Sequence, residues 1–400
     1  MNDVHGYRRA LIVGAGVAGL TSALVLRRQG WSVDVVEQAE GLRDGGYKVD
    51  IRGSAVDVID RLGLLEPVRA ADCGVRAGSV VGADGRVVAA MKGDTLGGRG
   101  REDVEIERGD LVRILADAAG EANFGRRVES LSQKTDRVKV TFADGSEGRY
   151  DVVVGADGLH SRIRGLAGID GGVSPLASMG YAIAVTQMPD AMGLDREETT
   201  FVRPGATVMT FRTAVREDAR AMVLFSFDGE LPEVHERRVA LLRRVLPDPV
   251  WQLPRVLQAF EDAPGFYMDT LTQVNLPAWH EGRVVLVGDS AGCASPASGQ
   301  GTTLALLGAY VTMTLLGRRP DDPAAAFTEA HAMLTPLVET NQSLGRSNIT
   351  RMVLPHRRAV AATLFALRVL RLLRMEDAVL GVVAKRLDKA SRLSLPADAA

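Results

Sequence analysis

Three glycines with the spacing G-x-G-x-x-G lie near the start of the chain, at Gly14, Gly16 and Gly19. In such a turn the first glycine permits the sharp bend, the second lets the backbone approach a pyrophosphate, and the third allows close packing of the following helix. The amides of Val17 and Ala18 would then open a helix whose positive dipole end faces the phosphates. This pattern predicts a dinucleotide site, and the alternative is a glycine-rich turn that binds nothing.

Glu37 supplies the acidic residue that a dinucleotide site also needs. It lies eighteen residues beyond Gly19, at the end of the apolar run 31–37 that follows a predicted helix over 18–29. A carboxylate there can bind the two hydroxyls of a ribose, and it disfavours a ribose 2′-phosphate. The glycines and Glu37 leave open whether the dinucleotide is NAD or FAD.

A second glycine-rich segment comes much later and also opens a predicted helix. An apolar strand over 283–287 leads to Asp289, and Gly299 and Gly301 precede a helix that begins at Thr302. Asp289 can accept hydrogen bonds from a polyol, and free amides at the helix start can stabilise the negative charge of a reduced flavin ring. The segment predicts a redox role, against the simpler interpretation of a tight turn before a core helix.

Together with a third segment, these motifs resemble those of a known enzyme family. Residues 150–164 and 283–292 are similar to the Asp-Gly and Gly-Asp motifs of the class A FAD-dependent monooxygenases, the para-hydroxybenzoate hydroxylase-like aromatic hydroxylases, near the tetracycline-inactivating members. The three motifs occur in the family's order across most of the first 320 residues. The resemblance implies FAD as the cofactor, with NADPH or NADH as a transient reductant.

The resemblance also implies roles for residues around the flavin. It places Asp289 on the ribityl chain, Pro296 near the reacting edge of the ring, and residues 299–303 around the ring carbonyls. For Arg108 it implies an FAD contact, where the alternative is a surface charge at a helix start. For Asp157 it implies a partly structural place between the FAD and nicotinamide surfaces. No side chain is assigned as catalytic, because the flavin supplies the chemistry.

The chain departs from the family pattern at several positions around the cofactor. Many members carry His where this chain has Gly292, Asn where it has Thr303, and Asp near Gly308, and a basic residue usually stands where this chain has Gln38. These changes remove polar side chains but keep the glycines and the helix start. FAD binding is therefore expected to survive them better than catalytic detail.

The activity that the resemblance implies is that of an FAD-dependent monooxygenase. NAD(P)H and O2 would serve to hydroxylate a bulky aromatic or polycyclic small molecule through a flavin hydroperoxide. Two alternatives stay open: a flavin-dependent reductase or oxidase of an isoprenoid or polycyclic substrate without oxygen insertion, and a non-catalytic regulator. Tetracycline-inactivating members hold their drug with a glutamine where loose alignment gives Ala184 here, so tetracycline itself is not expected.

The segments that must position these residues show two kinds of secondary-structure pattern. Strand and helix patterns alternate at both ends of the first 320 residues and predict an α/β fold with a Rossmann-like FAD-binding domain. A β-rich stretch between them predicts an inserted antiparallel β-sheet domain for the substrate. The predicted boundaries are 1–75, 100–178 and 276–322 for the FAD-binding domain, 76–99 and 179–275 for the substrate domain, and 323–400 for a C-terminal helical region.

Five side chains of the inserted sheet are candidates for substrate contact. They are Tyr181, Phe211, Arg212, Met222 and Phe225. Each of them can equally belong to plain core, because aromatic residues on strands commonly just pack. If they line a site, its lipophilic character predicts a bulky aromatic or polycyclic substrate.

Composition and spacing disfavour several other classes of protein. With 48 basic and 50 acidic residues among 400, the formal net charge is −2, so nothing draws the chain as a whole to nucleic acid. The 6 histidines lack metal-binding spacing, and no metal is expected. No apolar segment reaches the ~18–20 residues that a membrane-spanning helix needs, and the start of the chain does not resemble a signal peptide.

The two cysteines, Cys73 and Cys293, are too few for a disulfide scaffold and fit a reducing cytoplasm. Cys293 lies inside the flavin motif, where a small buried filler is favoured over a redox thiol or a covalent flavin link. The protein is expected to be a cytoplasmic monomer or homodimer whose partners are O2 and a small molecule.

The C-terminal region holds one further pattern. Between residues 359 and 387, Arg368, Arg371 and Arg374 recur at three-residue spacing among leucines and valines. A basic amphipathic helix can lie on a membrane surface or on a partner, but it usually covers a core. In the tetracycline-inactivating relatives a late helix bridges the two domains, and that role is the favoured one for this stretch.

Overall fold

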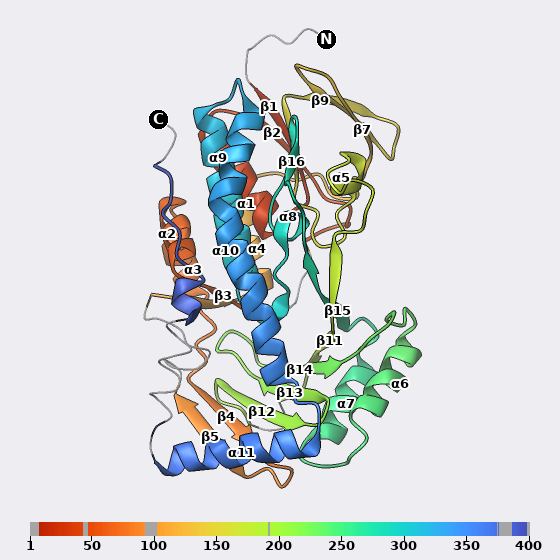
Figure 1. Ribbon diagram of the computed structural model, residues 1–400, viewed down its shortest axis with the longest axis vertical. Helices are drawn as coiled ribbons and strands as arrows, with labels where there is room; N and C mark the ends of the chain where they lie inside the picture. Colours follow the sequence, from red (N-terminus) through yellow and green to blue (C-terminus); the bar gives the residue numbers. More distant parts are fainter. Residues whose placement is uncertain are drawn as a thin grey trace.

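The computed structural model describes residues 8–42, 47–92, 102–190, 193–373, 375 and 386–397. Figure 1 shows an elongated molecule with one large sheet toward each end of its long axis. Helix α10 (Pro323–Met352) runs along much of that axis, and α11 (Arg357–Leu372) lies across one end.

The first sheet is mostly parallel and carries both glycine-rich segments. Its strands lie in the order β16 (His280–Glu281), β17 (Val284–Leu286), β10 (Val152–Gly155), β1 (Arg9–Val13) and β2 (Ser32–Val36). Among these strands β16 alone is antiparallel to its neighbour. The sheet is covered on both faces, so its strands are rich in buried Val and Ile. This is the predicted Rossmann-like α/β fold.

Two different layers cover that sheet. Helices α1 (Val17–Arg28), α4 (Arg108–Ala119) and α9 (Gly301–Arg318) share one core with its first face. A small antiparallel sheet packs on the second face and consists of β7 (Val128–Gln133), β8 (Val138–Phe142) and β9 (Glu147–Tyr150). Helix α9 is buried along most of its length, as its apolar sequence predicts. In the described part of the chain, every helix is too short or too polar to cross a membrane.

The second sheet contains seven strands. Their order is β15 (Tyr267–Val274), β11 (Leu176–Met188), β14 (Ala219–Ser226), β13 (Ala206–Phe211), β12 (Glu197–Arg203), β4 (Ala77–Val81) and β5 (Val87–Lys92). Neighbouring strands are antiparallel except for β12 and β4, which run parallel. The parallel pair arises because β4 and β5 come from an earlier part of the chain and join the sheet as a separate hairpin.

Alternation along the strands gives this sheet two distinct faces. The outer face, with residues such as Ala182 and Val223, packs against α6 (His235–Val245) and α7 (Leu253–Asp262). The inner face carries residues such as Ile183, which belongs to a cluster that also includes residues of α10 and of the loop before α9. Any side chain that serves the cofactor side must therefore lie on the inner face.

A two-stranded sheet connects the two large sheets. It pairs β3 (Lys48–Ile51) with β6 (Val104–Glu107). The remaining short helices are α2 (Ser54–Arg61), α3 (Leu65–Ala70), α5 (Arg162–Leu166), α8 (Asp289–Gly292) and the 3₁₀ turn η2 (Pro296–Ser298).

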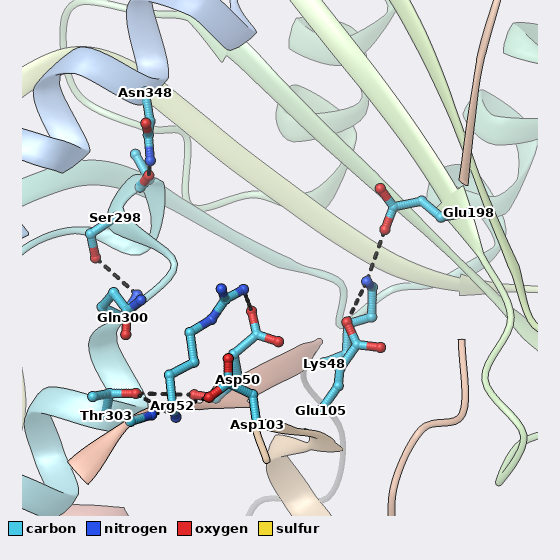
Figure 2. Close-up of polar contacts among 12 residues, drawn as sticks. Lys48, Asp50, Arg52, Asp103, Glu105, Glu198, Ser298, Gln300, Thr303 and Asn348 are labelled. Atoms are coloured by element: carbon cyan, nitrogen blue, oxygen red, sulfur yellow. Dashed lines mark hydrogen bonds and ion pairs between the residues drawn. The ribbon is translucent and has the colours of Figure 1, made fainter. Parts of the chain in front are cut away.

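The contact between β3 and the second sheet is ionic and buried. The Lys48 ammonium lies 2.7 Å from a Glu105 carboxylate oxygen and 2.9 Å from one of Glu198 on β12 (Figure 2). It also stands 5.4 Å from the centre of the Phe211 ring. Burial acts to lower the pKa of Lys48, but Glu198 and Glu105 outweigh it and the pKa is raised. The triad thus fixes where the second sheet docks.

The bridging role expected of residues 359–387 belongs instead to α10. Asn348 of α10 donates a hydrogen bond to the carbonyl of Ala297 at 3.1 Å, and Gln342 donates to that of Val274 on β15 at 2.8 Å. Helix α11 packs against β5 and β12 of the second sheet. Arg374 lies outside the described residues. With 30 residues α10 is long enough to reach both sheets, whereas α11, with 16, is not.

Candidate functional site

The first glycine-rich segment forms the turn between β1 and α1. Gly14 has φ +111°, and a Cβ there would lie 2.4 Å from the carbonyl oxygen of Ala156. A Cβ at Gly19 would lie 1.9 Å from the carbonyl oxygen of Gly14, whereas a Cβ at Gly16 would meet nothing within 4 Å. Two glycines are therefore required for packing, and Gly16 borders open space.

That open space lies at the start of α1. The helix begins after Gly16 without a side-chain cap and without an acidic residue in its first turn. The amides of Val17, Ala18 and Gly19 and the positive end of the helix dipole can therefore serve an anion. These residues fit the pyrophosphate of a dinucleotide.

Glu37 stands immediately after β2, beside the same turn. Its carboxylate accepts hydrogen bonds from the amides of Ala15 and Ala39, each at 3.0 Å. These two bonds hold the half-buried side chain at the rim of the glycine turn. Because a carboxylate has about four acceptor positions, it can still accept bonds from a ribose.

The Asp-Gly and Gly-Asp segments are distant in sequence but adjacent in space, since β10 and β17 pair. The Ser290 hydroxyl lies 2.6 Å from the carbonyl oxygens of both Gly155 and Val287. The buried Arg164 donates to the carbonyls of Ser290 at 3.2 Å and Leu159 at 3.0 Å. Burial lowers the pKa of Arg164. Sequence reasoning missed Arg164 as a link, although it lies within the quoted motif.

Asp157 uses both carboxylate oxygens to hold the start of α5. One accepts the Ser161 hydroxyl at 2.5 Å, and the other accepts the amides of Arg162 at 2.7 Å and Ile163 at 3.0 Å. These bonds account for the structural part of its expected role. A direct FAD contact would have to use the remaining lone pairs.

We expect Asp157→Ala to lower the free energy of unfolding of the FAD-free protein by ~1–2 kcal/mol, as loss of a helix cap does. Urea unfolding measures this, and titration with FAD should show less than a tenfold loss of affinity, on the order of 1 kcal/mol. Asp144→Ala is a control, since Asp144 makes similar bonds to Ser146 in an exposed turn. A hundredfold loss of FAD affinity in Asp157→Ala would instead indicate direct contact.

Asp289 and Arg108 interact electrostatically, and the side chains of both are exposed. Asp289 begins α8. Burial raises the pKa of its carboxyl, against the opposing effects of a hydrogen bond with Cys293 and the charge of Arg108. Arg108 is the first residue of α4, and its amide donates to the carbonyl of Tyr47 at 3.3 Å. The pair fits the polyol and phosphate groups of FAD.

Several residues of the loop before α9 and of its first turn are accessible to solvent. Pro296, Gly299, Gly301 and Thr302 keep solvent contact, whereas Gln300 between them is fully buried. Gly299 has φ +67° and ends the turn η2, so the chain reverses directly before the helix. Helix α9 has no side-chain cap and no acidic first turn. Its free amides fit the carbonyl edge of a flavin.

The structure explains two departures from the family pattern. The Thr303 hydroxyl accepts the amide of Arg52 at 3.2 Å and lies 3.4 Å from the carbonyl oxygen of Asp50, so it ties the end of β3 to α9 (Figure 2). A Cβ at Gly292 would lie 2.8 Å from a methyl group of Val338 on α10. A histidine at position 292 would therefore collide with the helix that bridges the two sheets.

Cys293 is enclosed rather than reactive. Its thiol lies 3.6 Å from the carbonyl oxygen of Thr272, and burial raises its pKa well above the ordinary value. A neutral, packed thiol fits the interpretation as a filler. Within the described ranges, no group of three or more His, Cys, Asp or Glu side chains could hold a metal ion.

Three of the five substrate candidates lie on the inner face of the second sheet. Tyr181 and Met222 border the cluster that also contains Ala297 of the loop before α9. Phe211 pairs with Glu198 of β12 and is fully buried beneath Lys48. Tyr181 and Met222 remain candidates, whereas Phe211 supports the ionic triad.

The other two candidates belong to the outer side, which corrects the expectation for them. Phe225 pairs with Ala182 and is buried in the core against α6 and α7. Arg212 forms ion pairs with Asp190 at 3.3 Å and Asp195 at 3.7 Å. Because successive side chains of a strand alternate between faces, neighbouring residues cannot all face one ligand. Both are removed from the proposed substrate surface.

Sequence reasoning missed a polar group on the inner face. Tyr267 and Asp269 of β15 pair with inner-face positions of β11, and the Tyr267 hydroxyl lies 3.3 Å from a carboxylate oxygen of Asp269. Tyr47, next to β3, interacts electrostatically with both. Burial raises the pKa of both phenols, that of Tyr47 to about 12. The only sequence signal was the period-two spacing of Tyr267 and Asp269.

Comparison with known proteins agrees with this geometry. A family model described as an FAD binding domain matches residues 8–318. A flavin-dependent monooxygenase of Legionella longbeachae is 32% identical over 341 residues, which cover 84% of this chain and 87% of that protein. An uncharacterized protein of Mycobacterium tuberculosis is 35% identical over 351 residues, which cover 86% of this chain and 94% of that one.

A solved structure extends the likeness to almost the whole chain. The crystal structure of tetracycline destructase Tet(51) has a TM-score of 0.83 and 30% sequence identity, and the match covers 98% of this chain and 100% of that one. The fold and the site thus define an FAD-binding flavoprotein. The chain belongs to the class A flavin-dependent monooxygenases, with FAD as its cofactor. This confirms the family that the three motifs predict and favours a monooxygenase over the reductase, oxidase and regulator alternatives.

Proposed function

We propose that this monooxygenase hydroxylates a bulky aromatic or polycyclic small molecule, with NADPH or NADH as reductant and O2 as the oxygen source. The observation that carries the proposal is the apolar cluster between the inner face and the loop before α9. Ile183 and Leu224 of the sheet belong to it with Ala297, and Tyr181 and Met222 form its partly buried border. A planar apolar molecule held against this wall would lie beside the flavin-facing loop.

FAD, when bound, supplies electron transfer from the nicotinamide and activation of O2. One oxygen atom enters the substrate as a hydroxyl group and the other leaves as water, which balances the two electrons from NAD(P)H. The protein itself would bind the cofactor, orient the substrate and keep water out. The α9 amides would stabilise negative charge on the flavin ring, Asp289 and Arg108 would hold polar groups of the cofactor, and the inner face would exclude water.

Tyr47, Tyr267 and Asp269 supply a polar end to this apolar wall. Phenols are protonated at neutral pH, so the Tyr47 hydroxyl can donate a hydrogen bond, while that of Tyr267 donates to Asp269. Asp269 can accept a bond from a substrate hydroxyl. We propose that a phenol or enol group of the substrate is oriented here. Ala184 lies in the outer-face core, so we infer that it does not contact the substrate.

The test is oxidation of NADPH and of NADH by the FAD-loaded enzyme over a panel of polycyclic phenols that includes tetracyclines. We expect a subset to stimulate nicotinamide consumption and to yield a product heavier by one oxygen atom, with label from ¹⁸O2. Stimulated consumption that yields only hydrogen peroxide, or a reduced product without added oxygen, would contradict hydroxylation.

Met222→Trp should obstruct the substrate wall without disturbing FAD. Met222 lies on the inner face, and the added bulk should raise KM by roughly tenfold to a hundredfold, equivalent to the ~1–3 kcal/mol cost of overpacking. Val173→Trp is the control, since Val173 is highly exposed in a loop. An unchanged KM with full FAD content in Met222→Trp would remove this residue from the substrate wall.

We also propose a monomer or homodimer in a reducing cytoplasm. Cys73 and Cys293 are both free and buried, and burial raises the pKa of both thiols. Unpaired buried cysteines are usual in reducing compartments. Sedimentation velocity of the purified protein measures the oligomeric state.

A further inference from the structure

Helix α11 presents an apolar stripe to solvent. Phe365, Leu372 and Leu373 are 68%, 83% and 58% exposed, and Val369 lies between them at 36%. The spacing i, i+4, i+7, i+8 places all four on one side of a helix. The opposite side holds Val360, the one buried residue of this helix. A contiguous exposed apolar stripe of this size marks an interaction surface, whereas apolar residues exposed singly do not.

The same helix is strongly basic. It contains Arg357, Arg358, Arg368 and Arg371 and no acidic residue, in a chain whose net charge is −2. At ~100° per residue, Arg358 falls within the stripe, and Arg357 and Arg368 fall along one border of it. Arg371 lies further round and donates to the carbonyl of Val87 on β5 at 2.8 Å, so it anchors the helix to the sheet.

We propose that α11 docks this protein on an anionic phospholipid surface. The apolar stripe would enter the boundary of the acyl chains while Arg357, Arg358 and Arg368 meet the headgroups, which is the geometry of an interfacial amphipathic helix. The positive charge of α11 favours an anionic lipid surface over a second copy of the same helix as the binding partner. Two α11 helices packed stripe to stripe would bring like charges together in a poorly solvated contact.

The position of α11 determines which end of the molecule would face the membrane. The helix lies across the end of the molecule that carries the second sheet (Figure 1). Between its first turns and the sheet lies a groove of about 660 Å³, lined by residues that include Phe201, Val250, Val360 and Leu364. A docked enzyme would therefore hold this end of the second sheet at the lipid surface, where apolar polycyclic compounds concentrate. The docking itself does not rest on the proposed substrate.

The test is cosedimentation of the full-length, FAD-loaded protein with vesicles of phosphatidylcholine, with and without phosphatidylglycerol. We expect binding to the phosphatidylglycerol vesicles at low salt, little binding to phosphatidylcholine alone, and release at high salt. Absence of cosedimentation, or equal binding to neutral vesicles at high salt, would overturn the proposal.

Two double variants test the two halves of the surface. Phe365→Ser with Leu372→Ser should weaken vesicle binding at least tenfold, because it removes the largest apolar groups. Arg358→Gln with Arg368→Gln should weaken it by roughly twenty-five-fold, at ~fivefold per arginine. All variants should keep full flavin absorbance.

A matched control removes the same charge elsewhere. Arg237→Gln with Arg244→Gln changes two exposed arginines on α6, and vesicle binding should fall less than twofold. A loss as large as that of the α11 arginine variant would overturn the assignment to α11. So would a Phe365, Leu372 variant that binds vesicles like the parent but changes from dimer to monomer in sedimentation, because the stripe would then be a contact between copies.

Discussion

Replacing Gly16 with valine should give a folded protein that contains no FAD. A side chain at Gly16 meets no protein atom within 4 Å, so the fold has no reason to resist it. The same side chain would occupy the open space at the start of α1, where two or three amides would bind the pyrophosphate. Since each such charge-assisted bond is worth ~1.5–3 kcal/mol, FAD affinity should fall on the order of a hundredfold or more.

Flavin absorbance of the purified variant and its unfolding curve measure the two effects separately. Gly19→Ala is the informative counterpart, since its Cβ would lie 1.9 Å from the carbonyl oxygen of Gly14. This variant should lose stability even in the FAD-free state. A Gly16→Val protein that binds FAD as tightly as the parent would show that the pyrophosphate does not lie at this turn.

Lys48→Met should destabilise the protein by ~3–5 kcal/mol, the usual cost of removing one member of a buried ion pair. The change leaves the buried carboxylates of Glu105 and Glu198 close to one another without the ammonium between them. Because Glu198 belongs to the second sheet and Glu105 to β6, the docking of that sheet should weaken. Urea unfolding gives the free energy, and KM for a bound substrate should rise together with it.

The natural control is Lys139→Met. Lys139 and Glu147 have the same N–O distance of 2.7 Å, but their side chains are 46% and 54% exposed. An exposed pair of this kind contributes less than ~1 kcal/mol. Equal losses in the two variants would show that burial does not distinguish the Lys48 triad.

The pH dependence of the Lys48 effect follows from the direction of its shift. The pKa of Lys48 is raised in the folded protein, so its stabilising contribution is complete below the ordinary lysine value of ~10.4 and is lost only as the pH rises through the raised value. The stability difference between parent and Lys48→Met should thus stay constant between neutral pH and mild alkali. A difference that vanished near neutral pH would assign the effect to another group.

Much of the cofactor side was predictable from sequence because its determinants are local. A tight turn, a helix start and an acidic strand end need particular residue types at fixed short spacings. Gly14, Gly16, Gly19 and Glu37 therefore revealed the turn between β1 and α1. The same logic identified Gly299 and Gly301 at the start of α9.

The substrate side was less predictable, because its determinants are not local. Which face of a strand looks inward depends on the register with its neighbours, so Met222 and Phe225 of one strand serve opposite cores. The sequence also carried no sign that Lys48 would meet Glu198, 150 residues further along the chain.

By itself, then, the sequence determined the family, the cofactor and the place of the glycine turns, since backbone conformation and helix ends depend on residues a few positions apart. Only the tertiary structure decided which strand residues lie on the inner face of the second sheet, which helix bridges the two sheets, and which helix has an exposed apolar stripe. Those properties arise when segments distant in the chain pack together and bury one another's surfaces, and no short spacing encodes that packing.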